Sequence, residues 1–259
     1  MNSKVRGVIL LCAGNGSRMG NITKDIPKCL LQVNDKELVI DYILKEILLH
    51  TDGEIVAVIG FNGQKVENHL KTKYGNRVKT VFNENYTKDT NIYSVELGVS
   101  SLKYSENGYI IIETDLLLDP NIWKIIFKES RENHSFWVCS SYYSSSLTGG
   151  IVHLSNNKNV DYIEYKPEYD PKYLGWSKMI GIMSVGPNEV KNDIKYRRLS
   201  IKKSIKQYYL QPWSKYIKEL PCKVLQIDNY FAKSFNTEKE YLEINEEFFK
   251  YQNKGLNNG

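Results

Sequence analysis

Residues 5–11 (VRGVILL) and the adjoining residues 12–20 (CAGNGSRMG) decide the fold. The first segment is β-branched and apolar and has the length of a strand, whereas the second consists mainly of small and turn-forming residues. Two glycines directly after a buried strand let the backbone turn tightly and bring its N–H groups close to a ligand. The stretch therefore predicts a buried strand that ends in an anion-binding loop.

The chain beyond this loop alternates between helical and strand patterns. Apolar residues recur at helical spacing in residues 38–49, 65–74 and 91–102. The intervening segments have strand character, namely residues 54–59, 78–83 and 109–113. Four strands separated by helices predict an α/β fold with a doubly wound, mostly parallel sheet.

The alternation weakens in the second half of the chain. A helix and a strand are expected at 121–132 and 135–143, and short strand-like segments follow at 151–154, 160–165 and 181–185. They indicate a small antiparallel lobe, at about residues 135–220, that binds an acceptor. A helical region interrupted by Pro212, a strand and a last helix complete the chain, at 189–220, 224–227 and 238–251. We interpret residues 1–259 as a single domain, because no stretch has the composition of a linker.

Composition favours a soluble globular protein. Hydrophobic residues make up 41% and charged residues 25% of the 259 positions, which excludes disordered and collagen-like classes. The longest apolar run near the start is far shorter than the roughly 20 residues that span a membrane, and no leader-like segment precedes it. The four cysteines are far apart and form no CxxC pair, so we expect no disulfide framework, no structural zinc and a cytoplasmic location.

Positive charge is concentrated in one part of the sequence. The net charge is +5, and residues 191–218 contain nine Lys or Arg but one acid, Asp193. We interpret this cluster as a solvated helical face. Attraction of a phosphorylated substrate is the alternative, and a nucleic-acid partner is the weakest interpretation.

Basic residues stand on both sides of the predicted anion-binding loop. Arg18 lies within the loop, and Lys28 follows in residues 26–30 (IPKCL). The loop is not a dinucleotide fingerprint, because Met19 replaces the third glycine, and no Gly-Lys-Ser/Thr of a Walker loop follows. Glycines combined with Arg18 and Lys28 favour a phosphate-binding site of another kind.

This segment resembles the signature of the nucleotidyltransferase family that includes sugar-1-phosphate nucleotidylyltransferases and phosphocholine cytidylyltransferases, roughly LxAGxGxRM and then TxxxPKxL. Each fixed position has its match, at Leu11, Ala13, Gly14, Gly16, Arg18, Met19, Thr23, Pro27, Lys28 and Leu30. The resemblance implies a Rossmann-like nucleotidyltransferase fold whose loop wraps a nucleoside triphosphate through Leu11, Cys12, Ala13, Gly14, Asn15, Gly16 and Ser17. It also implies two catalytic residues: Arg18 would engage the β and γ phosphates, and Lys28 would bridge the α phosphate and the incoming phosphate.

A carboxylate at the end of a central strand is the second landmark of this family, where it holds Mg²⁺ against the α phosphate. The predicted strand 109–113 continues into Thr114 and Asp115, at the sheet edge where such folds bind ligands. The resemblance thus implies Asp115 as a metal ligand and Thr114 as a nucleotide contact. Glu113 is a weaker candidate for the metal, and Asp119 is expected only to start a helix before a proline.

The second metal ligand in the family is usually an Asp near the C-terminus, in a segment like IDTxxDY. Residues 235–241 (FNTEKEY) match that segment, so Asn236 stands in the place of the usual Asp. An amide oxygen can bind Mg²⁺ but contributes no charge. Asn236 is the expected second ligand, and Asp228 is the fallback.

Residues 91–98 (NIYSVELG) resemble the stretch that follows the third strand in phosphocholine cytidylyltransferases, and their SVxxG also resembles cytidylyltransferases of isoprenoid synthesis. The resemblance implies that Ser94, with Asn91, lies beside the base. It favours CTP over UTP, dTTP or GTP. A helix N-terminus capped by Asn91 is the competing interpretation.

The acceptor site is expected in the lobe. Residues 163–167 (IEYKP) resemble the EKP element of sugar nucleotidyltransferases, although Tyr165 breaks it. Lys166 and Lys178 are both candidate phosphate ligands. Trp176, with other aromatic residues of the lobe, offers a surface that would hold an ammonium group by cation–π attraction, and core packing is the competing role.

These observations lead to one expected reaction and three alternatives. We expect transfer of CMP from CTP, with Mg²⁺, to a small acceptor such as phosphocholine, an aminoalkylphosphonate, phosphoglutamine or glycerol phosphate, for decoration of a capsule, lipopolysaccharide or lipid. The first alternative is a sugar-1-phosphate nucleotidylyltransferase that uses UTP or dTTP. The second is an inactive nucleotide sensor, and a nucleic-acid binder is the last. No nucleic acid and no membrane insertion are expected, and homo-oligomerisation stays open.

Overall fold

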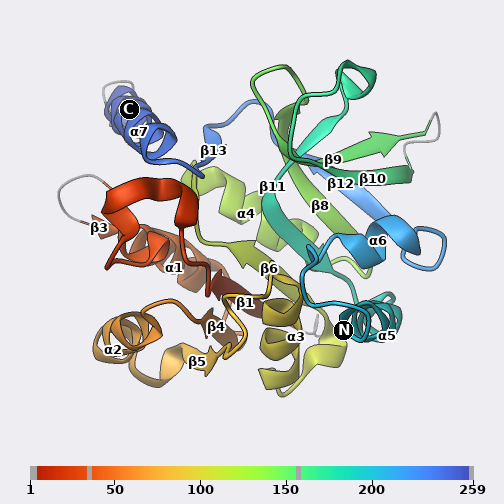
Figure 1. Ribbon diagram of the computed structural model, residues 1–259, viewed down its shortest axis with the longest axis horizontal. Coiled ribbons are helices and arrows are strands. Elements are labelled where there is room, and N and C mark those ends of the chain that lie inside the picture. Colours follow the sequence, from red (N-terminus) through yellow and green to blue (C-terminus); the bar gives the residue numbers. More distant parts are fainter. Residues whose placement is uncertain (1–4, 34–36, 156–158, 257–259) are drawn as a thin grey trace.

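The computed structural model describes residues 5–33, 37–155 and 159–256 (Figure 1). Four parallel strands form the core of the largest sheet, in the order β6-β1-β4-β5. Their bounds are Gly7–Cys12 (β1), Ile55–Ile59 (β4), Lys79–Phe82 (β5) and Tyr109–Glu113 (β6). β1 is central because its apolar side chains bury on both faces of the sheet.

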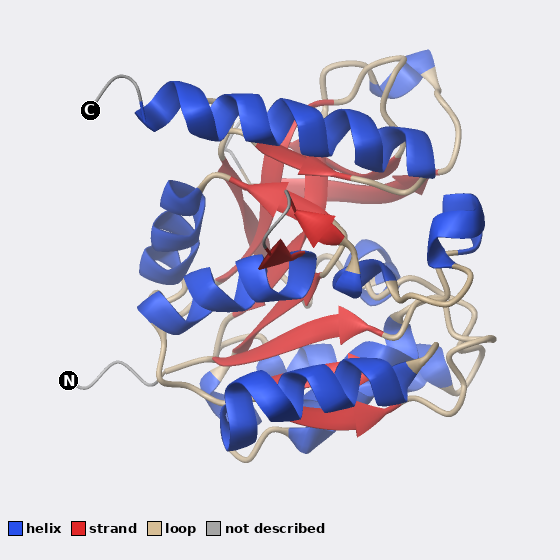
Figure 2. Ribbon diagram, turned by 90° about the vertical axis from the view of Figure 1, so that its left-hand side faces the viewer, coloured by secondary structure: helices blue, strands red, loops and turns tan. Residues whose placement is uncertain are grey.

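Helices cover both faces of this sheet (Figures 1 and 2). One layer packs against Val8 and Leu10 and contains α1 (Val39–His50), α2 (Gly63–Tyr74), α4 (Pro120–Glu129) and α7 (Glu238–Leu256). The other layer packs against Ile9 and contains α3 (Ile92–Ser101) and α5 (Val190–Ile201). Successive side chains of a strand point to opposite faces, so an uninterrupted apolar run serves both layers. The predicted doubly wound α/β fold is confirmed.

Antiparallel strands extend the sheet beyond β6. β11 pairs with β6 through its last residues and with β9 through its first, while β8 lies along its other edge. β10 pairs with β9, and β12 pairs in parallel with β8. The bounds are Ser135–Tyr142 (β8), Gly149–Leu154 (β9), Val160–Lys166 (β10), Ser177–Val185 (β11) and Cys222–Gln226 (β12). β11 therefore begins at Ser177 and not, as predicted, at Gly181, which lies inside the strand with a φ of +79°.

The C-terminal half differs from the prediction in a second place. α5 ends at Ile201, and α6 (Gln211–Lys215) contains Pro212 in its first turn, so this proline starts a helix and does not interrupt one. Proline fits there because the N–H groups of a first turn have no partner within the helix.

Two small sheets, which the sequence patterns do not predict, complete the fold. One joins β2 (Gln32–Val33) to β3 (Glu37–Leu38), and the other joins β7 (Leu116–Leu118) to β13 (Ala232–Ser234). The backbone N–H of Phe235, just after β13, donates to the carbonyl of Asp115 at 2.9 Å. This connection brings the segment that contains Asn236 to the end of β6.

The surface of the described residues agrees with the interpretation of the basic cluster as solvated. Arg197 is buried and bonded to Asp193 and Glu96, whereas the other basic residues of 191–218 are exposed. The four cysteines are free and buried. In the part of the chain that the structure describes, no helix combines the length and the apolar character that crossing a bilayer requires.

Candidate functional site

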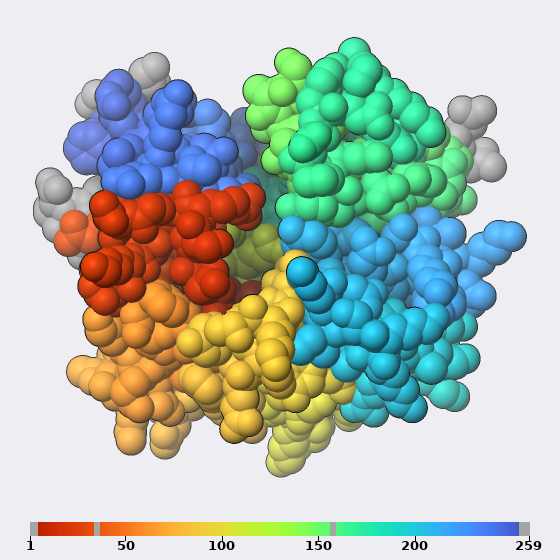
Figure 3. Space-filling view, in the orientation of Figure 1, coloured from red at the N-terminus to blue at the C-terminus, as the bar shows by residue number. Residues whose placement is uncertain are grey.

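A pocket of about 340 Å³ opens at the carboxyl ends of β1 and β6. Figure 3 shows this face of the molecule hollowed between the N-terminal segment (red), the segment near residue 90 (yellow) and the lobe (green and blue). The pocket is lined by the glycine loop, the start of α3, the end of β6, β11 and the residues before α6. Ligands of parallel sheets bind at this edge, because loops from several strands meet there.

The glycine loop has the geometry of an anion site. Gly16 has a φ of +61°, in the left-handed region that favours glycine. A Cβ added there would lie 2.9 Å from Oγ1 of Thr23, and this hydroxyl donates to the Gly16 carbonyl at 3.0 Å. All seven predicted loop residues line the pocket, namely Leu11, Cys12, Ala13, Gly14, Asn15, Gly16 and Ser17.

Replacement of Gly16 by Ala tests the loop. The left-handed backbone and the contact with Thr23 should cost about 1–2 kcal/mol of the free energy of unfolding, and the shifted loop should raise the KM for the nucleotide. Urea unfolding and steady-state kinetics measure the two effects. Gly75→Ala is the matched control, because Gly75 has a φ of +56°, open space around its Cβ and a place outside the pocket. Equal KM values for both variants would remove the loop from nucleotide binding.

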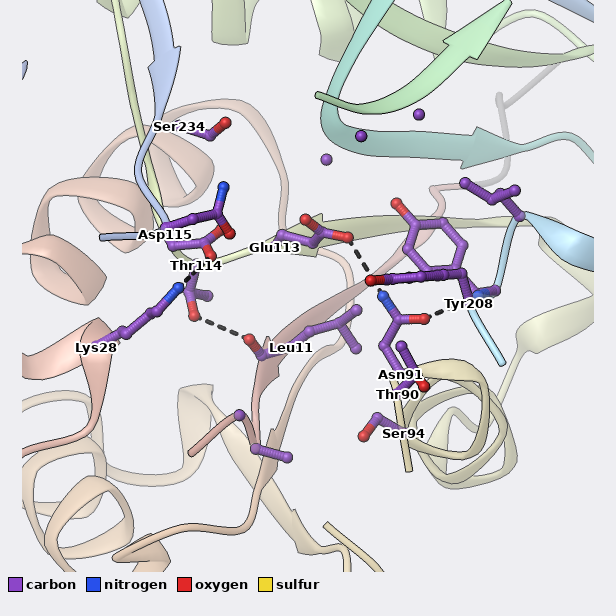
Figure 4. Close-up of a pocket in the computed structure, with 18 of the residues that line it drawn as sticks. Leu11, Lys28, Thr90, Asn91, Ser94, Glu113, Thr114, Asp115, Tyr208 and Ser234 are labelled. Atoms are coloured by element: carbon purple, nitrogen blue, oxygen red, sulfur yellow. Dashed lines mark hydrogen bonds and ion pairs between the residues drawn. The ribbon is translucent and has the colours of Figure 1, made fainter. Parts of the chain in front are cut away.

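Two pairs of side chains join the N-terminal segment to the rest of the pocket. Nζ of Lys28, in the short helix Lys28–Leu30, donates to Oδ2 of Asp115 at 3.0 Å (Figure 4). A guanidinium N–H of Arg18 donates to Oδ1 of Asn236 at 2.7 Å. The structure therefore brings together four residues that the sequence separates by up to 218 positions. All four line the pocket.

Thr114 connects the two strands that end at the pocket. Its hydroxyl donates to the Leu11 carbonyl at 2.9 Å, which ties the end of β6 to the end of β1. Thr114 also lines the pocket. Asp119 caps α4 by accepting from the N–H of Asn121, so its predicted role as a helix-start residue is confirmed.

Asn91 and Ser94 both line the pocket, and Asn91 occupies the N-cap position of α3, but another side chain bonds the free N–H groups of the helix. The Asp89 carboxylate accepts from the N–H groups of Tyr93 and Ser94, at 3.0 and 2.8 Å, and so caps α3. Asn91 makes no cap bond; its Oδ1 accepts from the Tyr209 N–H at 2.8 Å. The predicted N-cap position of Asn91 is confirmed, but its side chain does not cap the helix, because its Oδ1 is bonded to Tyr209 and the Asp89 carboxylate accepts from the free N–H groups.

Glu113 presents its carboxylate to the middle of the pocket (Figure 4). Burial and, secondarily, the nearby negative charge of Asp115 raise the pKa of Glu113 to about 7. Lys178 also lines the pocket, on the neighbouring strand β11, where burial lowers the pKa of its ammonium group. Nζ of Lys178 donates to the Met179 carbonyl at 2.7 Å.

Two of the three predicted acceptor residues lie outside the pocket lining. Lys166 pairs with Asp170 at 3.7 Å, and its Nζ lies 4.0 Å from the ring centroid of Tyr173. Trp176 packs edge-on against Tyr173, with the ring centroids 4.8 Å apart. Both side chains are thus engaged on the outer part of the lobe. Asp228, the fallback metal ligand, also lies outside the lining and pairs with Gln226.

The sequence patterns do not predict several of the residues that line the pocket. Tyr165 and Tyr208 stack with their ring centroids 3.8 Å apart and form one wall of the pocket. They come from β10 and from the segment before α6, so only the fold brings them together. A Tyr-Tyr-Leu run at 208–210, in a region interpreted as helical, was the one available signal.

The parallel sheet, the glycine loop after β1 and the opposed basic and acidic side chains define an α/β protein with a candidate site for a phosphorylated ligand. The chain belongs to the nucleotidyl transferase family, whose model matches residues 7–210. It is 34% identical over 144 residues to a choline-phosphate cytidylyltransferase of Streptococcus pneumoniae. The aligned residues cover 52% of this chain and 59% of that protein.

Other similarities fall within the same family. The chain is 26% identical over 135 residues to a D-glycero-alpha-D-manno-heptose 1-phosphate guanylyltransferase of Campylobacter jejuni, covering 48% of this chain and 53% of that protein. It thus spans just over half the length of these two curated relatives.

Solved structures share the fold. The CTP:phosphocholine cytidylyltransferase of Streptococcus pneumoniae superposes with a TM-score of 0.78 at 20% identity, over 94% of this chain and 100% of that chain. The inositol-1-phosphate CTP transferase of T. maritima gives a TM-score of 0.73 at 17% identity, over 93% and 95%.

Proposed function

We propose that this nucleotidyltransferase transfers CMP from CTP to a small phosphorylated or phosphonate acceptor and releases pyrophosphate. One observation carries the proposal: Lys28 and Asp115 form an ion pair at 3.0 Å beside the glycine loop, where the α phosphate of a bound nucleotide would lie. The similarity to a choline-phosphate cytidylyltransferase supports CTP as the donor. A pocket of about 340 Å³ suits a nucleotide and a small acceptor.

The proposed reaction needs no protein nucleophile. An oxygen of the acceptor phosphate attacks the α-phosphorus of CTP, the bond from this phosphorus to the oxygen that bridges it to the β phosphate breaks, and pyrophosphate leaves with the electron pair. A phosphate is largely ionised at neutral pH, so no general base is required. Lys28 and Arg18 would hold the reactants in line and offset the negative charge of the transition state.

The residues at the end of β6 fit Mg²⁺. This ion takes one or two oxygens from a protein and completes its shell with substrate phosphates and water. Asp115 keeps one carboxylate oxygen outside its bond to Lys28, and Asn236 offers an amide oxygen. Among the described residues no group of three or more His, Cys, Asp or Glu forms a metal site. We propose Asp115 and Asn236 as ligands; the ion would neutralise phosphate charge.

A sugar 1-phosphate is the second candidate acceptor, with UTP or dTTP as donor. The similarity to a heptose 1-phosphate guanylyltransferase supports a sugar 1-phosphate as the acceptor but not this choice of donor. The two candidates differ in both substrates, so one assay separates them.

Pyrophosphate release, measured with Mg²⁺ across the four nucleoside triphosphates and dTTP, tests the proposal. The acceptors are phosphocholine, 2-aminoethylphosphonate, glycerol 3-phosphate, phosphoglutamine and glucose 1-phosphate. We expect release with CTP and a small non-sugar acceptor. Release only with glucose 1-phosphate and UTP or dTTP would establish the second candidate. Tight nucleotide binding without release for any pair would support the nucleotide sensor.

A further inference from the structure

We propose that the Glu113 carboxylate determines acceptor specificity by binding a primary ammonium group of the acceptor. This inference rests on the proposed function, and it narrows the acceptors to amines that carry a phosphate or phosphonate a few bonds away. Its basis is a carboxylate at the centre of the pocket that has no cationic partner among the described residues.

The position of Glu113 relative to the proposed transfer site sets the distance between the two acceptor groups. Glu113 ends β6, and Asp115 follows two residues later. In Figure 4 the Glu113 carboxylate lies between Asp115 with Lys28, on one side, and Asn91 with Tyr208 on the other. An acceptor phosphate held beside Lys28 would therefore place its remaining atoms along Glu113, on the lobe side of the pocket.

The neighbouring strand makes room for this carboxylate. Gly181 of β11 has a φ of +79°, and a Cβ added there would lie 2.7 Å from Oε2 of Glu113. Any other residue would both strain the backbone and press on the carboxylate. The absence of a side chain at Gly181 thus leaves room for the Glu113 carboxylate beside β11.

No described residue forms an ion pair with Glu113, and the positive charges of Lys178, Lys28 and Arg18 act on its carboxylate only at longer range. Its one bond among the described residues comes from Nδ2 of Asn91 at 3.4 Å, which is long for a hydrogen bond. Lys178, on the neighbouring strand β11, donates its Nζ hydrogen bond to the Met179 carbonyl and not to Glu113. A carboxylate in such a place is stabilised by a ligand that brings its own positive charge.

The aromatic residues of the pocket favour a primary over a quaternary ammonium. Trp137 is 1% exposed, and its ring stacks on Tyr209, which is 5% exposed. Tyr165 and Tyr208 stack on each other. These four rings therefore form no open cage of the kind that binds a quaternary ammonium through several ring faces. A primary ammonium, by contrast, donates hydrogen bonds directly to a carboxylate.

The test compares acceptors with CTP as donor. Values of kcat/KM are measured for 2-aminoethylphosphonate, phosphocholine and glycerol 3-phosphate, with the wild-type enzyme, Glu113→Gln and the control Glu106→Gln. Glu106 is an exposed acid before the opposite end of β6. We expect the wild type to prefer the primary amine. In Glu113→Gln the ratio of kcat/KM for the amine over glycerol 3-phosphate should fall by about 10–100-fold, through the KM for the amine, because a charge-assisted hydrogen bond is lost. Glu106→Gln should keep the ratio.

Other results would distinguish a failure of the proposed role of Glu113 from a failure of the proposed function. A preference for phosphocholine, or an unchanged ratio in Glu113→Gln, would overturn the role of Glu113 and leave the proposed function standing. A raised KM for CTP with an unchanged ratio would place Glu113 beside the nucleotide and would also overturn its role. Absence of turnover with CTP and every acceptor would overturn the proposed function, and this inference with it.

Discussion

Lys28→Ala is expected to lower kcat by about 100-fold or more, which is the scale of losing one electrostatic stabiliser of a transition state. The ammonium group of Lys28 lies 3.0 Å from the Asp115 carboxylate, beside the proposed position of the α phosphate. Its removal would take away one of the positive charges that offset the negative charge on the phosphoryl oxygens in the transition state. Pyrophosphate release at saturating CTP measures the effect, and circular dichroism verifies the fold.

Lys24→Ala is the matched control for this variant. Lys24 is exposed, lies four positions earlier in the same segment and is outside the pocket lining. It should retain near-normal turnover. Equal rates for Lys28→Ala and Lys24→Ala would take Lys28 out of the mechanism.

Asp115→Asn is expected to abolish Mg²⁺-dependent turnover, with a loss of about 1,000-fold or more. The change keeps the size of the side chain and removes the one negative charge of the proposed ligand pair, because Asn236 is already neutral. The fold should survive, since the Asp115 backbone carbonyl that anchors Phe235 is unaltered. Rates measured across a Mg²⁺ titration give the result.

Asp228→Asn provides the comparison for the metal site. Asp228 lies outside the pocket lining, so this variant should keep its dependence on Mg²⁺. Activity retained in Asp115→Asn but lost in Asp228→Asn would place the metal at Asp228 and contradict the arrangement at the end of β6.

The fold is predictable from the sequence where one local pattern decides each element. Residues 5–11, an apolar run followed by glycines, predict β1 because β-branched residues favour strands and glycine weakens a helix. The start of β11 was predicted wrongly at Gly181, because a glycine often marks the end of a strand. Here β11 continues through Gly181 and pairs with β6, β8 and β9. The prediction for Pro212 was wrong in the same way, because proline is tolerated in a first turn.

The site is predictable only in the part that a short motif contains. Arg18, Lys28 and Asp115 follow from local spacing and from the resemblance to a family. The stacked Tyr165 and Tyr208 depend on a contact between segments 43 positions apart, to which no periodicity points. Lys166 and Trp176 show the complementary limit: their residue types suit an acceptor site, but both lie outside the pocket lining and contact Tyr173.

Transfer of the α phosphate is the most direct test of the account. CTP labelled with ³²P at the α position is incubated with Mg²⁺, the wild-type enzyme and each acceptor in turn, and the products are separated. We predict that the label moves into a CDP-linked product in the presence of one small phosphorylated or phosphonate acceptor. Label that stays in CTP, or that appears only as free CMP, would contradict the account.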